Sequence, residues 1–302
     1  MLSSVVGALL SAAVLAYVLP HADHTRHGRF VAGARRLRRS AVVVYSVLLA
    51  LNLWCAVSVP QAVVRDAVAV STLVATGAFG LVLAERRAPA ATVARRRRVL
   101  AVGAHPDDLE PACGATLAKL VDAGHEVRGL VMSPGGTGGA GGLRPAGARW
   151  GASSPGPADL QVLHFPDTEL ETVGDDMVRA VEAVITEFGP DVVLTHSAHD
   201  QHQDHYAVHQ ATLRAARAHH SILCFESPSV TRDFDPSVFV DIDGYVDVKV
   251  EAVLSHRDQA GKPYMTPGRV RGMAAFRGAQ AKNTNAEAFE PVRLLGSAIG
   301  DL

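Results

Sequence analysis

The first hundred residues alternate between long apolar stretches and arginine-rich ones. Residues 1–20, 41–59 and 67–84 contain no Asp, Glu, Lys or Arg and are rich in Val, Leu and Ala. Each stretch has close to the ~20 residues that an α-helix needs to cross a bilayer. We therefore predict three transmembrane helices in a membrane region that covers residues 1–98.

Two other interpretations of these stretches are possible. A buried helix of a soluble protein normally carries a polar stripe, because one of its faces meets water. Residues 42–59 offer only Tyr45, Ser46, Asn52 and Ser58 for such a stripe. The first stretch resembles a signal peptide in length, but arginines follow its apolar run rather than precede it. Both patterns favour membrane helices.

From Val99 onward the apolar runs become shorter, and expected strands alternate with expected helices. The strands cover residues 99–102, 127–132, 160–165, 191–195, 222–225 and 238–242, and the helices cover residues 114–123, 177–188, 205–218 and 246–257. This alternation is typical of an α/β domain with a mainly parallel sheet and helices on both faces. We expect one such domain over residues 99–302.

The distribution of charge divides the chain at the same place. Residues 1–98 hold 13 arginines, no lysine and three acidic residues, whereas residues 99–302 hold 16 basic and 27 acidic residues. Positive loops beside transmembrane helices remain in the cytoplasm. We therefore expect the N-terminus and the 60–66 loop outside, and the 21–40 loop and everything after residue 85 inside. The domain of residues 99–302 would therefore be cytoplasmic.

The sequence around the arginine clusters indicates that they contact lipid headgroups rather than nucleic acid. No aromatic residues interleave with the arginines of 35–39 and 95–98, as stacking on bases would require. Juxtamembrane arginines commonly lie among anionic headgroups instead. The expected partners are a lipid bilayer and a small-molecule substrate, without nucleic acid, and the oligomeric state stays open.

Two short motifs carry the candidate chemistry. Ala104-His105-Pro106-Asp107-Asp108 directly follows the first strand of this domain, and His202-Gln203-Asp204-His205 follows the strand at 191–195. Active sites of open parallel sheets lie beyond the carboxyl ends of the strands, so both motifs should meet at one edge. Together they supply two imidazoles and a carboxylate for a metal, with a carboxylate and an imidazole left over. Three ligands leave a position open for water, which a hydrolase needs.

The motifs resemble those of the LmbE/PIG-L family of zinc-dependent N-deacetylases. The resemblance covers about residues 97–290 and also includes Glu110, Phe165-Pro166-Asp167, Thr195-His196, Asp200-Gln201, Lys249, His256 and Gln259. It implies a Rossmann-like fold. It also implies an enzyme that removes acetyl from an N-acetylglucosamine unit attached to a lipid, an inositol or another carrier.

Carried over residue by residue, the resemblance makes His105, Asp108 and His205 the zinc ligands. Asp107 would be the general base, and protonated His202 would stabilise the oxyanion. Adjacent side chains after a strand point in different directions, so Asp107 and Asp108 can divide proton transfer and metal binding between them. Two histidines and one carboxylate also form the facial site of non-haem iron, so Fe²⁺ stays an alternative to Zn²⁺.

Three further residues are candidates for supporting roles. Asp200 and Asp204 could hold histidine rings in one tautomer, or could cap the helix that begins nearby. Residues 136–141 read Gly-Thr-Gly-Gly-Ala-Gly and match a dinucleotide-binding pattern. Prolines after this segment break the helix that would bind a pyrophosphate, so we expect a substrate loop with Arg144 as a substrate-binding candidate.

Three functions are compatible with these patterns. The leading one is a membrane-anchored N-deacetylase acting on an amino sugar carried by a lipid, an inositol or an envelope precursor. The second keeps the metal and makes the chain an amidase on a thiol conjugate or an acylated peptide antibiotic. The third is a membrane scaffold without catalysis, which the full set of His105, Asp107, Asp108, His202 and His205 argues against.

Overall fold

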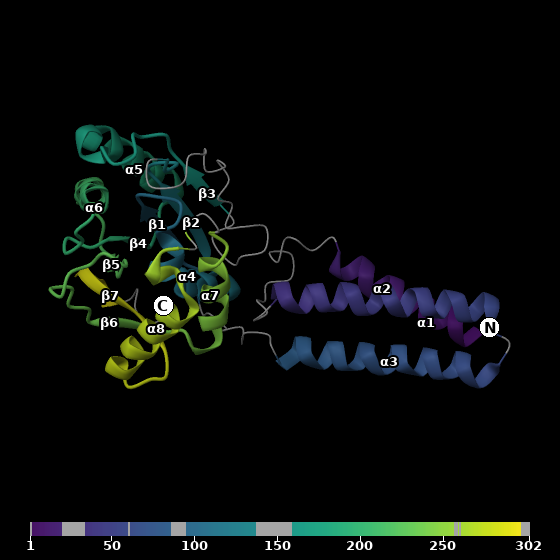
Figure 1. Cartoon of the computed structure of the whole chain (residues 1–302). Coiled ribbons are helices and arrows are strands. Elements are labelled where there is room, and N and C mark those ends of the chain that lie inside the picture. The colour runs from purple at the N-terminus through teal and green to yellow at the C-terminus, as the bar shows by residue number, and fades with distance from the viewer. Residues whose placement is uncertain are drawn as a thin grey trace. The chain divides into compact units, whose positions relative to one another are not determined.

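The computed structural model describes residues 2–19, 34–59, 61–85, 95–136, 159–256, 259 and 261–296. The chain divides into two compact units (Figure 1). One comprises Met1–Arg26 and Val31–Ala88, and the other comprises His27–Phe30 and Pro89–Leu302. Arg144 and residues 137–141 lie outside the described residues.

The first unit is a bundle of three helices, α1 (Leu2–Val18), α2 (Ala34–Ser58) and α3 (Ala62–Glu85). Each helix contains most of one of the apolar stretches of the sequence, and all three pack against one another. Leu37–Ser58 and Ala62–Ala84 are long and apolar enough to cross a membrane, whereas Leu2–Val18 is a shorter apolar helix.

Polar side chains lie inside this bundle beside apolar ones such as Tyr45, and many large apolar side chains lie on its outside. Asn52 is fully buried and donates from Nδ2 to Thr72 Oγ1 at 2.9 Å. A Cβ atom at Gly7 would lie 2.2 Å from Asn52 Oδ1, so the glycine permits the close approach of α1 to α2. By contrast, Trp54 is 59% exposed and Val57 is 88% exposed.

The second unit is built on one seven-stranded sheet. Its strands are β1 (Arg98–Gly103), β2 (Glu126–Val131), β3 (Asp159–Val162), β4 (Val192–His196), β5 (Ile222–Phe225), β6 (Val238–Asp241) and β7 (Ala286–Arg293), in the order β3-β2-β1-β4-β5-β7-β6. The first five are parallel, and β7 runs antiparallel to both β5 and β6. The predicted mainly parallel sheet is therefore confirmed.

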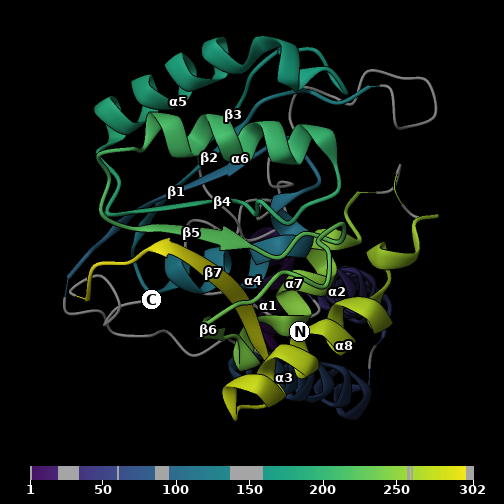
Figure 2. The ribbon, with the colours of Figure 1, turned by 90° about the vertical axis from the view of Figure 1, so that its left-hand side faces the viewer.

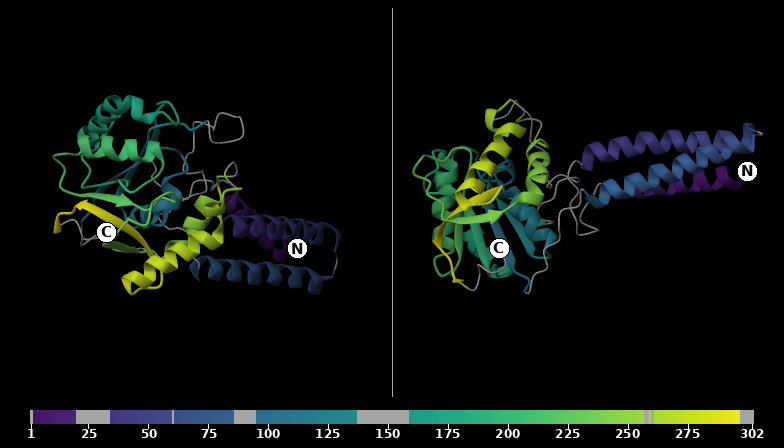
Figure 3. Two further views of the ribbon diagram at one scale, coloured as in Figure 1. Left: turned by 60° about the vertical axis from the view of Figure 1, so that its left-hand side comes forward. Right: turned by 90° about the horizontal axis from the view of Figure 1, so that it is seen from below.

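Helices cover both faces of the sheet, as predicted. They are α4 (Leu109–Asp122), α5 (Gly174–Phe188), α6 (Gln203–Ala215), α7 (Val246–Val253) and α8 (Pro267–Ala281), with short 3₁₀ turns at Leu170–Val173, Asp243–Tyr245 and Pro263–Met265. The α5 and α6 helices lie side by side on one face, and α4 and α7 lie on the other (Figures 2 and 3). Fully buried Leu100, Leu130 and Met177 belong to the core between the sheet and α5. Burying each such side chain stabilises the folded state by about 1.5–3 kcal/mol.

Two elements were not predicted, and one helix begins earlier than expected. These elements are α8 and β7. The pattern of β7 is untypical of an inner strand, because it contains Pro291 and two glutamates, Glu287 and Glu290. The helix expected from residue 114 begins at Leu109 instead. Its dihedral angles break at Cys113 (φ −135°, ψ 17°), so the continuous helical pattern that a sequence reveals starts only after the kink.

A buried carboxylate stabilises this kink. Glu287 accepts the backbone N–H groups of Ala115 at 3.0 Å and Thr116 at 2.7 Å, and Lys249 Nζ lies 2.6 Å from its Oε1. Negative charge is favourable at the N-terminus of a helical segment. The carboxylate thereby supports the second half of α4, while the first turn of α4 follows Asp108 directly.

We expect Gly278→Ala to destabilise the second unit, because α8 touches the chain entering β7 there. An added Cβ atom would lie 2.3 Å from the carbonyl oxygen of Thr284. The overpacking should cost about 1–3 kcal/mol and lower the melting temperature of the full-length chain in detergent. Gly272→Ala is the matched control on the same helix, since nothing lies within 4 Å of its added Cβ. It should leave the melting temperature unchanged or raise it.

Candidate metal centre and active site

Both sequence motifs lie at the carboxyl edge of the sheet, as their positions after β1 and β4 predict. The first occupies the turn between β1 and α4, and the second spans the start of α6. The structure brings His105, Asp108, His202 and His205 into one cluster. It adds His196, the last residue of β4, whose Nε2 lies 3.2 Å from Asp108 Oδ2.

Asp108 is the centre of this cluster. Its Oδ2 accepts the backbone N–H groups of Ala104 at 3.0 Å and His105 at 2.7 Å. Its Oδ1 lies 3.3 Å from His205 Nε2, and its Oδ2 lies 3.6 Å from His105 Nδ1. The backbone bonds hold the carboxylate in place while its oxygens face two imidazoles.

The structure permits several ligand sets rather than one. Atoms close enough to share an ion occur in three groups: His105 with His202 and His205, Asp108 with His196 and His205, and His105 with Asp167 and Asp204. The imidazole rings themselves are closely packed. The His202 and His205 rings stack with centroids 4.4 Å apart, and the His196 and His205 rings stack at 4.0 Å.

The donors fit a divalent cation. Imidazole nitrogens and carboxylate oxygens are the usual ligands of Zn²⁺, at about 2.0–2.2 Å, so two ligand atoms of one tetrahedral ion lie roughly 3.3–3.5 Å apart. The separation of 3.3 Å between Asp108 Oδ1 and His205 Nε2 agrees with this spacing. The cluster is also buried, with His105, Asp108 and His205 each less than a tenth exposed.

Two carboxylates lie against the outer nitrogens of His205 and His105, which are candidate metal ligands. Asp200 Oδ2 lies 2.9 Å from His205 Nδ1, and Asp204 Oδ2 lies 3.1 Å from His105 Nε2. Such partners orient metal-binding imidazoles and select their tautomers. Asp200 is itself held by the hydroxyl groups of Ser227 and Ser229.

The helix cap expected from Asp200 or Asp204 is supplied by another residue. The N-cap of α6 is His202, whose Nδ1 accepts the backbone N–H of Asp204 at 3.2 Å. Asp204 is occupied elsewhere, because its carboxylate accepts the N–H groups of Thr168 at 2.7 Å and Leu170 at 3.1 Å. Asp200 does accept the N–H of His202 at 3.0 Å, just before the helix.

The surrounding carboxylates change the pKa values of the histidines. Burial by itself lowers the pKa of His105, but its hydrogen bonds to Asp108 and Asp204 outweigh burial and raise the pKa to about 10. At His205, burial is likewise outweighed by the charge and hydrogen bonds of Asp108 and Asp200, which raise the pKa to about 9. The same carboxylates that attract protons here would attract a cation, which competes with protons for imidazole.

His202 has the opposite environment. Burial and the neighbouring charges of His205 and His105 lower its pKa. This direction favours the neutral imidazole at pH 7, whereas the sequence analysis expected the protonated form. Because Nδ1 accepts a backbone N–H, the single proton of the neutral ring is on Nε2. Nε2 is thus a hydrogen-bond donor.

Asp107 precedes Asp108 in the turn between β1 and α4. Its Oδ2 lies 3.9 Å from Lys262 Nζ, in the segment that joins α7 to α8. The Lys262 ammonium in turn lies 5.6 Å from the centre of the Tyr264 ring. The site is therefore bordered on this side by a segment to which sequence reasoning assigned no role.

Sequence reasoning missed several residues of the site. His196 and Asp167 were noticed only as parts of a family pattern, although His196 ends β4 at the edge where active sites form. Asp167 lies 3.0 Å from His105 Nε2. Ser227 and Ser229 had no detectable signal, because their role depends on β5 lying beside β4.

Comparison with known proteins gives consistent matches to this unit. A model of the PIG-L family, described as GlcNAc-PI de-N-acetylase, matches residues 100–216. An uncharacterized deacetylase of Escherichia coli (strain K12), YaiS, is 36% identical over 170 residues, which cover 54% of this chain and 92% of the relative. A probable N-acetyl-alpha-D-glucosaminyl L-malate deacetylase 2 of Bacillus cereus is 29% identical over 184 residues, which cover 54% of this chain and 84% of the relative.

A solved structure shares the fold. The conserved protein TT1542 from Thermus thermophilus superimposes with a TM-score of 0.57 at 24% identity, covering 66% of this chain and 96% of that protein. At this level of identity the similarity demonstrates the architecture alone, and chemistry has to be argued from the site.

Proposed function

The chain belongs to the PIG-L family of de-N-acetylases, which hydrolyse N-acetyl amide bonds, and we propose that it uses a divalent cation to remove the acetyl group from an amino sugar. It is an enzyme of the deacetylase class. The observation that carries the metal-dependent reaction is the contact of Asp108 with His105 and His205, beside a neutral imidazole and a second carboxylate.

In this proposal His105, Asp108 and His205 hold the cation, with Zn²⁺ the first candidate and Fe²⁺ the alternative. When bound, a divalent cation supplies Lewis acidity, which polarises the amide carbonyl and makes water more acidic. Asp200 and Asp204 keep the two histidines oriented through their second nitrogens. His196 lies against the other side of Asp108 and is fully buried.

Asp107 and His202 supply the remaining groups of the reaction. Asp107 takes the proton of the attacking water as the new C–O bond forms, and then returns it to the nitrogen as the C–N bond breaks. Acetate and the free amine leave. His202 donates from Nε2 to the oxygen that gains negative charge, a role that a neutral imidazole can fill. Lys262 Nζ lies 3.9 Å from Asp107 Oδ2.

An amino sugar is proposed as the acetylated group from the names of the relatives. The family model is described by its action on GlcNAc-PI, and the Bacillus cereus relative is named for an N-acetylglucosaminyl substrate. Both names contain an N-acetylated glucosamine unit, although the groups attached to it differ. The proposal therefore covers the amino sugar and leaves its carrier open.

We also propose that the first unit anchors the enzyme in a membrane, with the catalytic unit in the cytoplasm. Two of its helices have the length and composition to cross a bilayer. Buried Asn52 and Thr72 hydrogen-bond inside the bundle while Val57 and Trp54 face outward, which is the arrangement that lipid as a solvent favours. The arginines of residues 35–39 and 95–98 supply the positive charge expected on the cytoplasmic side.

The metal content of two variants tests whether Asp108 or His202 is a ligand of the cation. Asp108→Asn should lower cation affinity by at least about 100-fold, whereas His202→Asn should keep the cation, because Asn still caps α6. Elemental analysis of the purified full-length proteins measures both and identifies the metal. The reverse result, with metal lost from His202→Asn and kept by Asp108→Asn, would assign the ion to His105, His202 and His205.

The release of acetate from N-acetylglucosamine derivatives tests the reaction. Asp107→Asn should retain its metal and lose about 10²–10⁴-fold in kcat, because the base is removed. His202→Asn should lower kcat about 10²–10³-fold, because the donor to the developing negative charge is removed. Asp175→Asn is the control, since Asp175 is exposed on α5 and pairs only with surface arginines in the described structure. Release of a longer acid with no acetate, or full activity of Asp107→Asn, would contradict the proposal.

Labelling with a membrane-impermeant maleimide tests the anchor and its orientation. The three native cysteines are buried, so single cysteines introduced at exposed Gln61 and Asp233 should dominate the reaction. Gln61→Cys should react in intact cells, and Asp233→Cys only after the cells are opened. Labelling of Asp233→Cys in intact cells would reverse the orientation, and recovery of the chain in the soluble fraction would exclude the anchor.

A further inference from the structure

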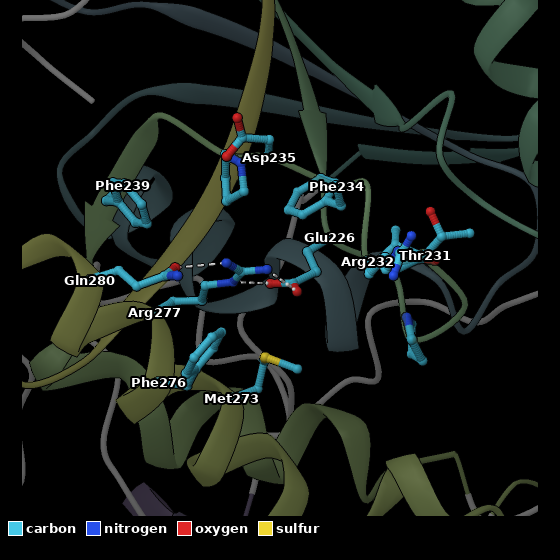
Figure 4. A pocket seen from close by; sticks show the side chains of 14 residues that line it. Glu226, Thr231, Arg232, Phe234, Asp235, Phe239, Met273, Phe276, Arg277 and Gln280 are labelled. Atoms are coloured by element: carbon cyan, nitrogen blue, oxygen red, sulfur yellow. Dashed lines mark hydrogen bonds and ion pairs between the residues drawn. The ribbon is translucent and has the colours of Figure 1, made fainter.

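A cavity lies in the catalytic unit, beside the loop that supports Asp200 behind the proposed metal ligand His205. It has a volume of about 770 Å³ and is bounded by the segment Glu226–Pro236, by Phe239 of β6 and by one side of α8 (Figure 4). We call it the α8 pocket. Small-molecule sites commonly have volumes of about 300–1,000 Å³, so the α8 pocket can hold a ligand.

The centre of the α8 pocket is a buried ion pair. Arg277 is 8% exposed and binds the Glu226 carboxylate through two bonds, Nε to Oε2 at 2.8 Å and a terminal nitrogen to Oε1 at 2.5 Å. Its other terminal nitrogen donates to Gln280 Oε1 at 2.7 Å. The guanidinium is therefore satisfied by its neighbours. The net charge of the pocket wall is zero, because it contains two acidic residues, Glu226 and Asp235, and two basic ones, Arg232 and Arg277.

Aromatic rings form the walls around this pair. The Arg277 guanidinium lies 5.5 Å from the centre of the Phe234 ring and 5.0 Å from that of Phe276. Phe276 is 52% exposed and Met273, one turn before it on α8, is 49% exposed. Figure 4 shows Phe276 and Met273 on one side of the ion pair and Phe239 and Phe234 on the other.

We propose that the α8 pocket is a subsite for a neutral sugar ring, so that the substrate of this enzyme contains at least one sugar beyond the acetylated one. A sugar ring has an apolar C–H face, which can cover an exposed phenyl ring such as Phe276. Its hydroxyl groups can bond to the Gln280 amide, the Thr231 hydroxyl and the Asp235 carboxylate, all of which line the pocket.

Other ligand classes fit this pocket less well. A fatty chain would bury the polar groups of the pocket without hydrogen bonds, which costs free energy for each group. A charged ligand would compete with the Arg277–Glu226 pair, and breaking a buried pair leaves an uncompensated charge. A neutral ring with many hydroxyl groups avoids both costs.

The same chain segment borders the α8 pocket and supports the metal centre. Ser227 and Val230 line the pocket. The Ser227 hydroxyl donates to Asp200, which holds His205, and Val230 pairs with Asp200 in an isolated β-bridge. A glycan bound in the pocket therefore lies next to the residues that position a proposed metal ligand. The claim that the pocket binds part of the substrate rests on the proposed function. The claim that it binds a sugar does not.

Binding of cellotriose and maltotriose, which carry no N-acetyl group, tests the pocket independently of the reaction. Calorimetry on the full-length protein should detect binding of at least one of them. Phe276→Ala should weaken it about two- to tenfold, because the stacking surface is lost, and Phe276→Tyr should restore it. Leu295→Ala is the matched control, since Leu295 is 49% exposed and does not line the pocket. It should leave affinity unchanged.

Kinetics test whether the bound glycan is part of the substrate. Phe276→Ala should raise KM for triacetylchitotriose about two- to tenfold, and leave kcat and the rate with N-acetylglucosamine unchanged. Absence of trisaccharide binding, equal binding by Phe276→Ala, or Phe276-dependent binding of sodium decanoate in place of the sugars would overturn the proposal. Sugar binding without any acetate release would refute the proposed reaction and leave the glycan site standing.

Discussion

The carboxylate of Asp108 joins the parts of the site that are distant in sequence. Two backbone N–H groups at the end of β1 fix its orientation, and from there it reaches His196 at the end of β4 and His205 on α6. A buried carboxylate that is not paired in this way would be strongly unfavourable. The parallel pairing of β1 with β4 brings these residues to the same edge of the sheet and so permits the contact.

Support for this arrangement comes from residues far from the motifs. Glu287 on β7 and Lys249 on α7 form a buried pair that stabilises α4 at its break, just after the turn that carries Asp108. Ser227 and Ser229 hold Asp200 from the loop after β5. A buried polar group loses its hydrogen bonds to water and needs a partner in the protein. These contacts supply such partners, and they connect late elements of the chain to the early motif.

The two units differ in what they expose, although both have buried apolar side chains. In the sheet unit apolar side chains such as Leu100 and Leu130 form the interior, because removing them from water is favourable. In the helical unit Asn52 and Thr72 lie inside while Val57 lies outside. The exposed apolar surface and the buried polar pair have a simple physical reason if lipid surrounds the helices, because polar groups then have partners only within the bundle.

The sequence by itself determined the order of strands and helices up to α7, the edge at which the two motifs meet, and the residue types available for a metal. These features follow from local patterns, because hydrophobic periodicity and the ends of strands depend on residues that are close together in the sequence. Only the tertiary structure decided that His196 contacts Asp108, that His202 rather than Asp200 caps α6, and that Glu287 supports α4. These contacts join residues from different elements, up to about 170 positions apart, so no local pattern specifies them.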